Sequence, residues 1–294
     1  MNRTSLHLVL IALLTVFLPA HACINETGTN HRGEQVTLIY TAGQRLKSQL
    51  VTPATKEAMI TWSWRVIEMA RQDPSFDKLN NLAVVLIRLG RLPEAATLLK
   101  TLERKYPGHY ETASNLGTAY ELMGRNKDAL KWILEGVKRN PDDHFGTEWL
   151  HVHILNAKLG RIPAPAAGSS ILNLDFGNDV IPQRPARFPN GNTGKPLSLF
   201  AVAHAIRYQL LERIQFVAAP DPMIAALLLD WANLELVAGT VESADVLYDA
   251  STRYGSREGK IIAVRKAKAA QILAQAKAKP ALQEGSCELC EPPG

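Results

Sequence analysis

The sequence lacks the short motifs that mark the common enzyme families. It contains no Gly-x-Ser-x-Gly motif and no spacing that joins serine, histidine and aspartate into a triad. Residues 255–261, GSREGKI, have three residues between the glycines where a phosphate loop has four, and isoleucine follows the lysine. His151 and His153 point to different faces of a helix, whereas paired metal ligands there need i, i+4 spacing. We interpret both as ordinary helix residues, and expect no catalytic residue, metal site or cofactor.

Cysteine is scarce, with only Cys23, Cys287 and Cys290 in the chain. The pair Cys287-Glu-Leu-Cys290 is followed by Glu291, so the c-type haem signature, which needs histidine there, fails. A zinc site needs about four ligands, and a thioredoxin-like pair opens a helix in a βαβ unit. We expect a disulfide in an oxidising compartment. Cys23 pairs with one tail cysteine, or carries a lipid while the tail pair closes on itself.

The net charge is small, and the densest run of basic residues is not interleaved with aromatic residues. The formal net charge is +5, and the densest basic run comprises Arg265, Lys266, Lys268, Lys277 and Lys279. This run has no interleaved aromatic residues on which nucleic-acid bases would stack. We interpret it as a solvated helix face and expect no nucleic-acid partner.

Long apolar runs are missing, apart from residues 8–18 near the start of the sequence. Arg3 precedes this run, and the small residues of Ala20-His21-Ala22 follow it. This is the layout of a secretory signal peptide, and the run is shorter than the about 20 residues that a membrane-spanning helix needs. We predict that residues 1–22 are removed and that the protein is exported to the periplasm or the cell exterior.

Cleavage at this point would make Cys23 the first residue of the mature chain. That position allows a lipid anchor, but Ala20 stands where bacterial lipoproteins usually have leucine. We therefore favour plain release, with contact to a membrane only if Cys23 is lipidated.

Two segments, 76–109 and 110–143, align without gaps. Four pairs of identical residues lie 34 positions apart: Leu82 and Leu116, Gly90 and Gly124, Ala95 and Ala129, Pro107 and Pro141. A period of 34 residues is that of a helix–turn–helix repeat. The chain therefore contains two copies of one structural unit.

These segments resemble the tetratricopeptide repeat. In that family a Leu-Gly pair and an aromatic residue mark helix A, a small residue marks helix B, and a proline ends the repeat. The second repeat has Leu116, Gly117, Tyr120, Ala129 and Pro141, and the first has Leu82, Ala83, Leu86, Ala95 and Pro107. Leu79 and Ala113 replace the usual tryptophan, and Gly136 replaces a small alanine.

The apolar pattern supports the same helices independently. Leu79, Leu82, Ala83, Leu86 and Leu89 follow the spacing of one helix face, and Gly90 follows as a stop. A second stripe comprises Ala95, Ala96, Leu98, Leu99 and Leu102. We expect the small residues to face each other where helices A and B meet, Ala83 against Ala95 and Gly117 against Ala129.

Each helix pair leaves an apolar face that a neighbour must cover, so further helices are expected on both sides. We predict a tetratricopeptide region over residues 56–160. It begins with helix B of a degenerate repeat at 56–72 and ends with a helix at 145–159. An N-terminal extension, 23–55, precedes it.

The remainder of the chain, residues 161–294, is less regular. Residues 161–196 contain six prolines and predict a long irregular Pro/Gly-rich connector, in which 171–176 alternates like a strand lying against the solenoid. A second helical block, 197–279, has an apolar stripe of Leu197, Phe200, Ala201, Ala205, Tyr208 and Leu211. It continues with a divergent repeat around Gly239 and a capping helix at 260–279. Residues 280–294 are expected to be a flexible tail.

The resemblance implies an all-α solenoid that binds proteins rather than an enzyme. Tetratricopeptide proteins hold peptides or partner domains on the surface lined by their A helices. The corresponding positions are Asp77, Asn80, Val84, Ile87, Arg88, Glu111, Ser114, Thr118, Glu121 and Leu122. Asn80 and Val84 stand where the chaperone-tail-binding class has lysine and asparagine, so that ligand is not expected.

The function expected from the sequence is therefore an exported protein–protein interaction scaffold. Two alternatives remain open. One is a redox or thiol-dependent protein that uses the pair Cys287 and Cys290, and the other is a structural component of an envelope assembly.

Overall fold

The computed structural model describes residues 26–38, 43–51, 56–163, 170–256, 259–278 and 284–290. The predicted signal segment, its cleavage site and Cys23 lie outside these residues. The described part contains twelve helices and two short strands. The prediction of an all-α helical solenoid is therefore confirmed. No helix in these ranges is both long and apolar enough to cross a membrane.

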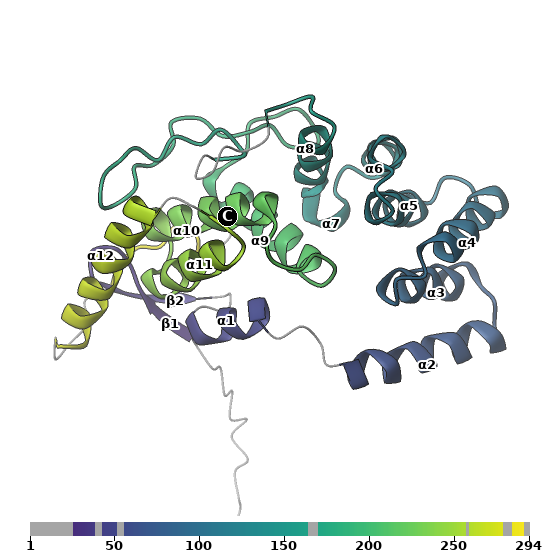
Figure 1. Cartoon of the computed structure of the whole chain (residues 1–294), viewed down its shortest axis with the longest axis horizontal. Coiled ribbons are helices and arrows are strands. Elements are labelled where there is room, and N and C mark those ends of the chain that lie inside the picture. The colour runs from purple at the N-terminus through teal and green to yellow at the C-terminus, as the bar shows by residue number, and fades with distance from the viewer. Residues whose placement is uncertain are drawn as a thin grey trace, which may run out of the picture.

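The two repeats form four antiparallel helices (Figure 1). They are α3 (Phe76–Arg88), α4 (Leu92–Lys105), α5 (Tyr110–Leu122) and α6 (Asn126–Arg139), and each packs against the next. Gly90 and Gly124 follow α3 and α5 with φ of 73° and 75°. Glycine adopts this left-handed conformation without steric cost, so the turns within both repeats are specified locally.

Small residues form the core of the repeats, but one expected pair is wrong. Ala95 and Ala129 are fully buried, as a close crossing of two helices requires. Gly117, however, does not have Ala129 as its nearest neighbour. A methyl group at Gly117 would lie 2.4 Å from the Cδ1 atom of Ile133, one turn further along α6. Gly117 is thus needed to admit a large side chain.

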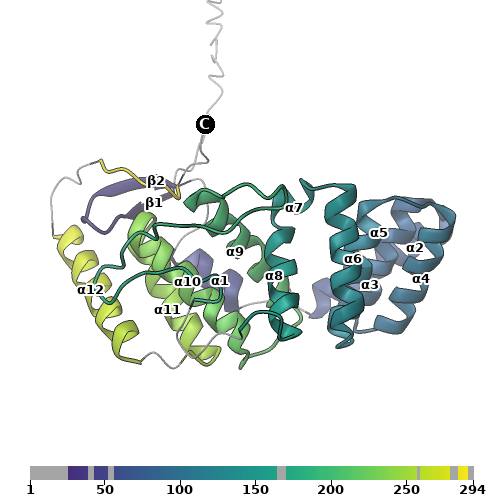
Figure 2. The same ribbon diagram turned by 90° about the horizontal axis from the view of Figure 1, so that it is seen from above.

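Further helices cover both ends of the repeats, as Figure 2 shows from above. Helix α2 (Lys56–Gln72) packs against α3, and α8 (Glu148–Lys158) packs against α6. The helix expected at 145–159 does not begin at Phe145. A separate turn, α7 (Asp143–Gly146), comes first because His144 and Phe145 adopt positive φ angles of 49° and 58°, which interrupt an α-helix.

The second helical block surrounds a central helix. It consists of α9 (Leu199–Arg213), α10 (Pro222–Ala238), α11 (Val241–Arg253) and α12 (Gly259–Lys277). Every residue of α10 from Ile224 to Leu234 is buried. Asp221 and Thr240 cap α10 and α11, since each side chain accepts a backbone hydrogen bond in the first turn.

The apolar stripe expected near α9 is only the edge of its buried face, where Leu197, Phe200 and Leu211 pack against the core while partly buried. Of the six stripe positions only Ala205 is buried, and the buried face instead includes Leu199, Val202, Ala203, Ile206 and Leu210. Apolar residues occur around most of this helix, so periodicity did not define the face that meets its neighbours.

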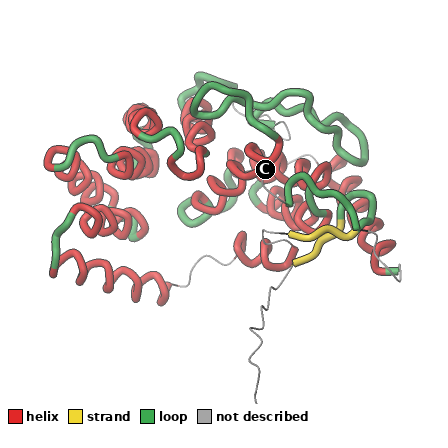
Figure 3. The backbone as a smooth tube through the Cα atoms, turned by 180° about the vertical axis from the view of Figure 1, so that it is seen from behind, coloured by secondary structure: helices red, strands yellow, loops and turns green. Residues whose placement is uncertain are grey.

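The connector crosses the C-terminal helices without helix or strand in its described part, 161–163 and 170–196 (Figure 3). Leu172, Leu174 and Phe176 are buried and the intervening Asn173 and Asp175 are exposed, as the predicted alternation requires, although this segment does not form a strand. Arg265 of α12 donates hydrogen bonds to the backbone oxygen atom of Gly177 at 2.9 Å and to Asn233 Oδ1 at 2.7 Å. Arg265 is 3% exposed, which contradicts its assignment to a solvated face.

The N-terminal extension also packs on this second block. Strands β1 (Glu26–Thr29) and β2 (Gln35–Leu38) pair antiparallel, and α1 (Gly43–Val51) packs against α11. Thr29 donates hydrogen bonds from its backbone nitrogen and Oγ1 to the Glu242 carboxylate at 2.9 and 2.8 Å. Sequence periodicity gave no indication of this hairpin.

Residues 284–290 are not the flexible tail that we expected. Gly285 donates a hydrogen bond to the backbone oxygen of Gln35, and Leu289 donates one to that of Ala238. Cys287 and Cys290 form a disulfide with each other, and Cys290 is only 3% exposed. The cysteine pair is therefore a packed turn against the end of α10.

Candidate functional site

A cavity of about 280 Å³ lies between the A helices of the repeats and the second helical block. We call it the groove cavity. Its walls come from α3, α5, α7, α8 and α9 and the turn that follows α9. Six of the ten expected groove residues line it: Val84, Ile87, Arg88, Thr118, Glu121 and Leu122.

The other four expected residues do not line this cavity. Asn80 is buried, and its Oδ1 atom accepts a hydrogen bond from Asn115 at 3.1 Å. Ser114 is also buried and donates to Asp143 Oδ2 at 3.1 Å. Asp77 is exposed and Glu111 is half-buried, both away from the cavity wall. Asn80 and Ser114 hold neighbouring helices together and are not available to a ligand.

Glu121 is the centre of a buried charge cluster. Its carboxylate contacts His151 Nε2 at 2.6 Å, Lys158 Nζ at 2.7 Å and Arg213 Nη1 at 2.7 Å. Burial alone would raise the pKa of Glu121, but Arg213, His151 and Lys158 together hold that pKa well below its ordinary value. The carboxylate is therefore ionised and internally paired. Glu121 lines the cavity but is already committed to helices α8 and α9.

A second carboxylate, Glu148, extends this cluster. Glu148 Oε1 lies 2.6 Å from His144 Nδ1, and Oε2 lies 3.2 Å from His151 Nδ1. Burial opposes the charged forms, but the mutual pairing lowers the pKa of Glu148 far below its ordinary value. Burial lowers the pKa of His144 and His151, but the nearby carboxylates together have the larger effect and raise both pKa values above the ordinary value.

The interpretation of His151 as an ordinary helix residue was therefore wrong. His151 is 5% exposed and bridges Glu121 of the repeats to Glu148 of its own helix. The i, i+3 spacing of Glu148 and His151 was a signal in the sequence for part of this cluster. His153 instead contacts the backbone oxygen of Ile171 through Nε2 at 2.8 Å.

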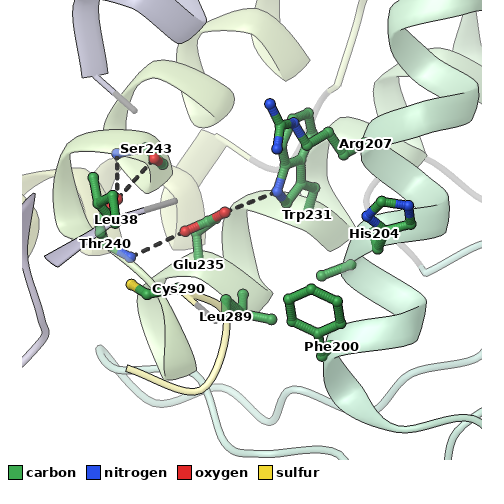
Figure 4. A pocket seen from close by; sticks show the side chains of 11 residues that line it. Leu38, Phe200, His204, Arg207, Trp231, Glu235, Thr240, Ser243, Leu289 and Cys290 are labelled. Atoms are coloured by element: carbon green, nitrogen blue, oxygen red, sulfur yellow. Dashed lines mark hydrogen bonds between the residues drawn. The ribbon is translucent and has the colours of Figure 1, made fainter. Parts of the chain in front are cut away.

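A smaller cavity of about 30 Å³ lies beneath the cysteine turn (Figure 4). Trp231 Nε1 and the backbone nitrogen of Thr240 donate to the Glu235 carboxylate, both at 3.0 Å. Burial raises the pKa of Glu235. A volume of this size holds about one water molecule, so this cavity is too small for a peptide side chain. In the described residues, no group of three or more His, Cys, Asp or Glu side chains is arranged so that it could hold a metal ion.

Comparison with known proteins identifies the repeats. Residues 86–145 match the model of the tetratricopeptide repeat family. The chain therefore contains tetratricopeptide repeats over these residues. No curated protein sequence matches it. The solved structure titled "MamA RS-1 ArsTM double mutant" is similar at 12% identity and a TM-score of 0.32, over 80% of this chain and 95% of that chain.

The tetratricopeptide match runs from the end of α3 to α7 and includes the whole of α4, α5 and α6. It therefore contains the α5 wall of the groove cavity, with Thr118, Glu121 and Leu122. Helix α9, which supplies Arg213 and closes the opposite side, lies outside the matched residues. The tetratricopeptide repeats and a segment outside the matched residues thus build the cavity together.

Proposed function

We propose that this protein is an exported protein–protein interaction scaffold that binds a peptide or a short segment of a partner protein in the groove cavity. The tetratricopeptide repeats support the general role, because proteins of this kind bind other proteins. The observation that carries the proposal is a cavity of about 280 Å³ built on the A-helix positions of both repeats.

The walls of the groove cavity combine apolar and cationic groups. Val84 and Leu122 are half-buried apolar side chains that line it. Arg88 also lines it, and has no ion pair among the described residues. Its guanidinium lies 5.3 Å from the centre of the Trp62 ring. These groups supply hydrophobic contact and one cation for a ligand.

The buried charge cluster fixes the shape of the groove cavity before any ligand arrives. Glu121 joins α5 to Lys158 of α8 and Arg213 of α9, so the three walls are held in one arrangement. A preformed site loses less conformational entropy when a ligand binds. We therefore assign the cluster a positioning role, with the ligand contacted by the apolar wall and Arg88.

A matched pair of variants tests the groove cavity. Val84→Arg places a large charged side chain in the cavity, whereas Thr97→Arg adds the same side chain at an exposed position on α4. In a pull-down of partners from the compartment that receives the protein, we expect Val84→Arg to lose a partner that wild type and Thr97→Arg both retain. Retention by all three proteins would refute binding in this cavity.

The proposal of export rests on the N-terminal sequence. Intact-mass measurement of the native protein tests this proposal. We expect a mature chain that begins at Cys23. A mass that still contains residues 1–22 would contradict export by cleavage at this site. An added diacylglycerol mass would instead support a lipid anchor.

The redox alternative has less support. Reactive cysteines are partly exposed in electropositive surroundings. Cys290 is 3% exposed, and Cys287 Sγ lies 3.6 Å from the backbone oxygen of Ala238. The disulfide therefore resembles a clamp that fixes the turn to α10 more than a site that meets a substrate.

A further inference from the structure

A third cavity, of about 450 Å³, is lined by other residues of the same α7 turn that borders the groove cavity. We call it the aromatic cavity. The side chains of Phe145, Trp149, Phe200 and His204 line it, together with the loop around Asn192. Phe200 and His204, whose rings stack with centres 6.0 Å apart, both come from α9 (Figure 4). Its lining is therefore rich in π-faces.

Phe145 is held in an unusual position. Its side chain is 78% exposed although it is large and apolar. Its backbone has φ of 58°, and the neighbours His144 and Gly146 also have positive φ, at 49° and 71°. Non-glycine residues adopt this conformation at an energetic cost, and such strain gathers at ligand sites. Edge contacts fix the ring, with centres 5.6 Å from His204 and 5.7 Å from Tyr208.

The charges around the aromatic cavity favour a cationic ligand. Among the described residues, no lysine or arginine lines it, whereas the exposed carboxylate of Asp142 does. Burial and the nearby Arg207 lower the pKa of His204, so this ring is neutral at pH 7. Aromatic faces attract cations, and guanidinium groups stack on them.

Asn192 adds an acceptor to the lining. Its Nδ2 atom donates to the backbone oxygen of Pro141 at 2.7 Å, which fixes the side-chain amide. Its Oδ1 atom is buried and has no hydrogen-bond partner in the described part of the chain. A buried acceptor without a partner is costly, and an N–H donor would satisfy it. An aliphatic side chain would leave this atom unpaired, and an acidic one would be repelled by Asp142.

We propose that the aromatic cavity binds an arginine side chain of a protein partner. The planar guanidinium stacks on the exposed face of the Phe145 ring, donates to Asn192 Oδ1 and lies near the Asp142 carboxylate. This site is separate from the groove cavity and does not depend on the function proposed for it.

Two blocked tripeptides test the proposal on the mature full chain. The probes are acetyl-Gly-Arg-Gly-amide and its citrulline counterpart, which has nearly the same shape without the charge. We expect saturable NMR shifts at Phe145 and Asn192, with the arginine peptide binding at least about 5-fold more tightly. Phe145→Leu keeps an apolar side chain but removes the π-face, so it should abolish this preference.

Leu134→Ala is the matched control, because Leu134 is 48% exposed on α6 and does not line the aromatic cavity. It should leave both affinities unchanged, and circular dichroism should show that both variants fold. Equal affinity for the two tripeptides would overturn the proposal. So would tighter binding of acetyl-Gly-Glu-Gly-amide, or no saturable shift at Phe145 and Asn192 up to millimolar peptide.

Discussion

The repeat helices and the C-terminal block reach a buried core in different ways. In α3 to α6, each helix packs against the next helix along the chain. In the C-terminal block, α10 is buried on all sides, and distant segments hold its surroundings in place. Arg265 reaches Gly177, 88 residues away, and Thr29 reaches Glu242, 213 residues away.

This difference means that a substitution should affect the two regions in different ways. In the repeats, neighbouring helix pairs share one core, so damage should spread along the solenoid. In the C-terminal block, buried polar groups connect segments that lie far apart in the chain, in addition to apolar packing. Loss of one such group should release a segment while the repeats stay folded.

The largest effect is expected at Arg265. Arg265→Met removes the guanidinium that donates to Asn233 Oδ1 and to the backbone oxygen of Gly177, and leaves Asn233 Oδ1 with Tyr248 as its remaining donor. We expect a loss of about 3–5 kcal/mol in the free energy of unfolding of the C-terminal block. Chemical denaturation measures this loss, and hydrogen exchange should show lost protection in 170–179 but not in α3 to α6.

Lys268→Met is the matched control, because Lys268 bonds only the exposed Gln271 on the same helix. It should change the free energy of unfolding by less than about 0.5 kcal/mol. Equal losses from the two variants would contradict the role given to Arg265.

A substitution of Asp230 is expected to increase the free energy of unfolding rather than to reduce it. Burial raises the pKa of Asp230 to about 8 although Ser170 Oγ donates to its carboxylate at 2.9 Å. Because the folded-state pKa lies above the unfolded value, the associated stability is full below about pH 4 and is lost as the pH rises through about 8. Asp230→Asn removes this loss, since the amide does not titrate.

The variant should therefore match wild type at pH 4 and be more stable at pH 9, by up to about 4 kcal/mol. Urea denaturation of both proteins at the two pH values measures the difference. A variant that is less stable than wild type at pH 9 would show that Asp230 is ionised and usefully paired in the folded protein.

Ala129 tests the repeat core. Ala129→Leu adds three carbons at a fully buried crossing of α5 and α6 and should cost about 1–3 kcal/mol. Lys127→Leu, at an exposed position two residues earlier, should not change the midpoint of unfolding. Denaturation followed by circular dichroism compares the two. Equal midpoints would show that the assigned helix register is wrong.

The smallest effect is expected at the disulfide. In protein freshly isolated from its native compartment, thiol trapping should find Cys287 and Cys290 oxidised. Replacing both with serine should loosen residues 284–290 and cost about 1–2 kcal/mol, because the bond closes only a short loop. Free alkylation of both cysteines before reduction would contradict the assignment of this turn as a clamp.

The contrast between the regions also explains what the sequence predicted. The 34-residue period and the glycines after helix A were local signals, and they gave α3 to α6 correctly. The buried side of α9, the hairpin and the packed cysteine turn depend on contacts between distant residues. No local pattern encodes such contacts, so the sequence did not predict them.

Part of the candidate site was also predictable from local sequence, and part depends on contacts between distant residues. The repeat positions Val84, Thr118 and Leu122 line the groove cavity as the family resemblance suggested. The resemblance did not show that α9 closes the cavity or that Arg213 pairs with Glu121. That contact needs α9 to pack across from α5, after a connector that no repeat pattern describes.

We propose that a partner binds on the A-helix side of the repeats. Site-specific photo-crosslinking tests it most directly, with one photoreactive residue at Thr118, which lines the groove cavity, or at Thr97, which is exposed on α4. We expect a covalent adduct with the partner from position 118 and none from position 97. An adduct from position 97 alone would place the partner on the B-helix side and contradict the account.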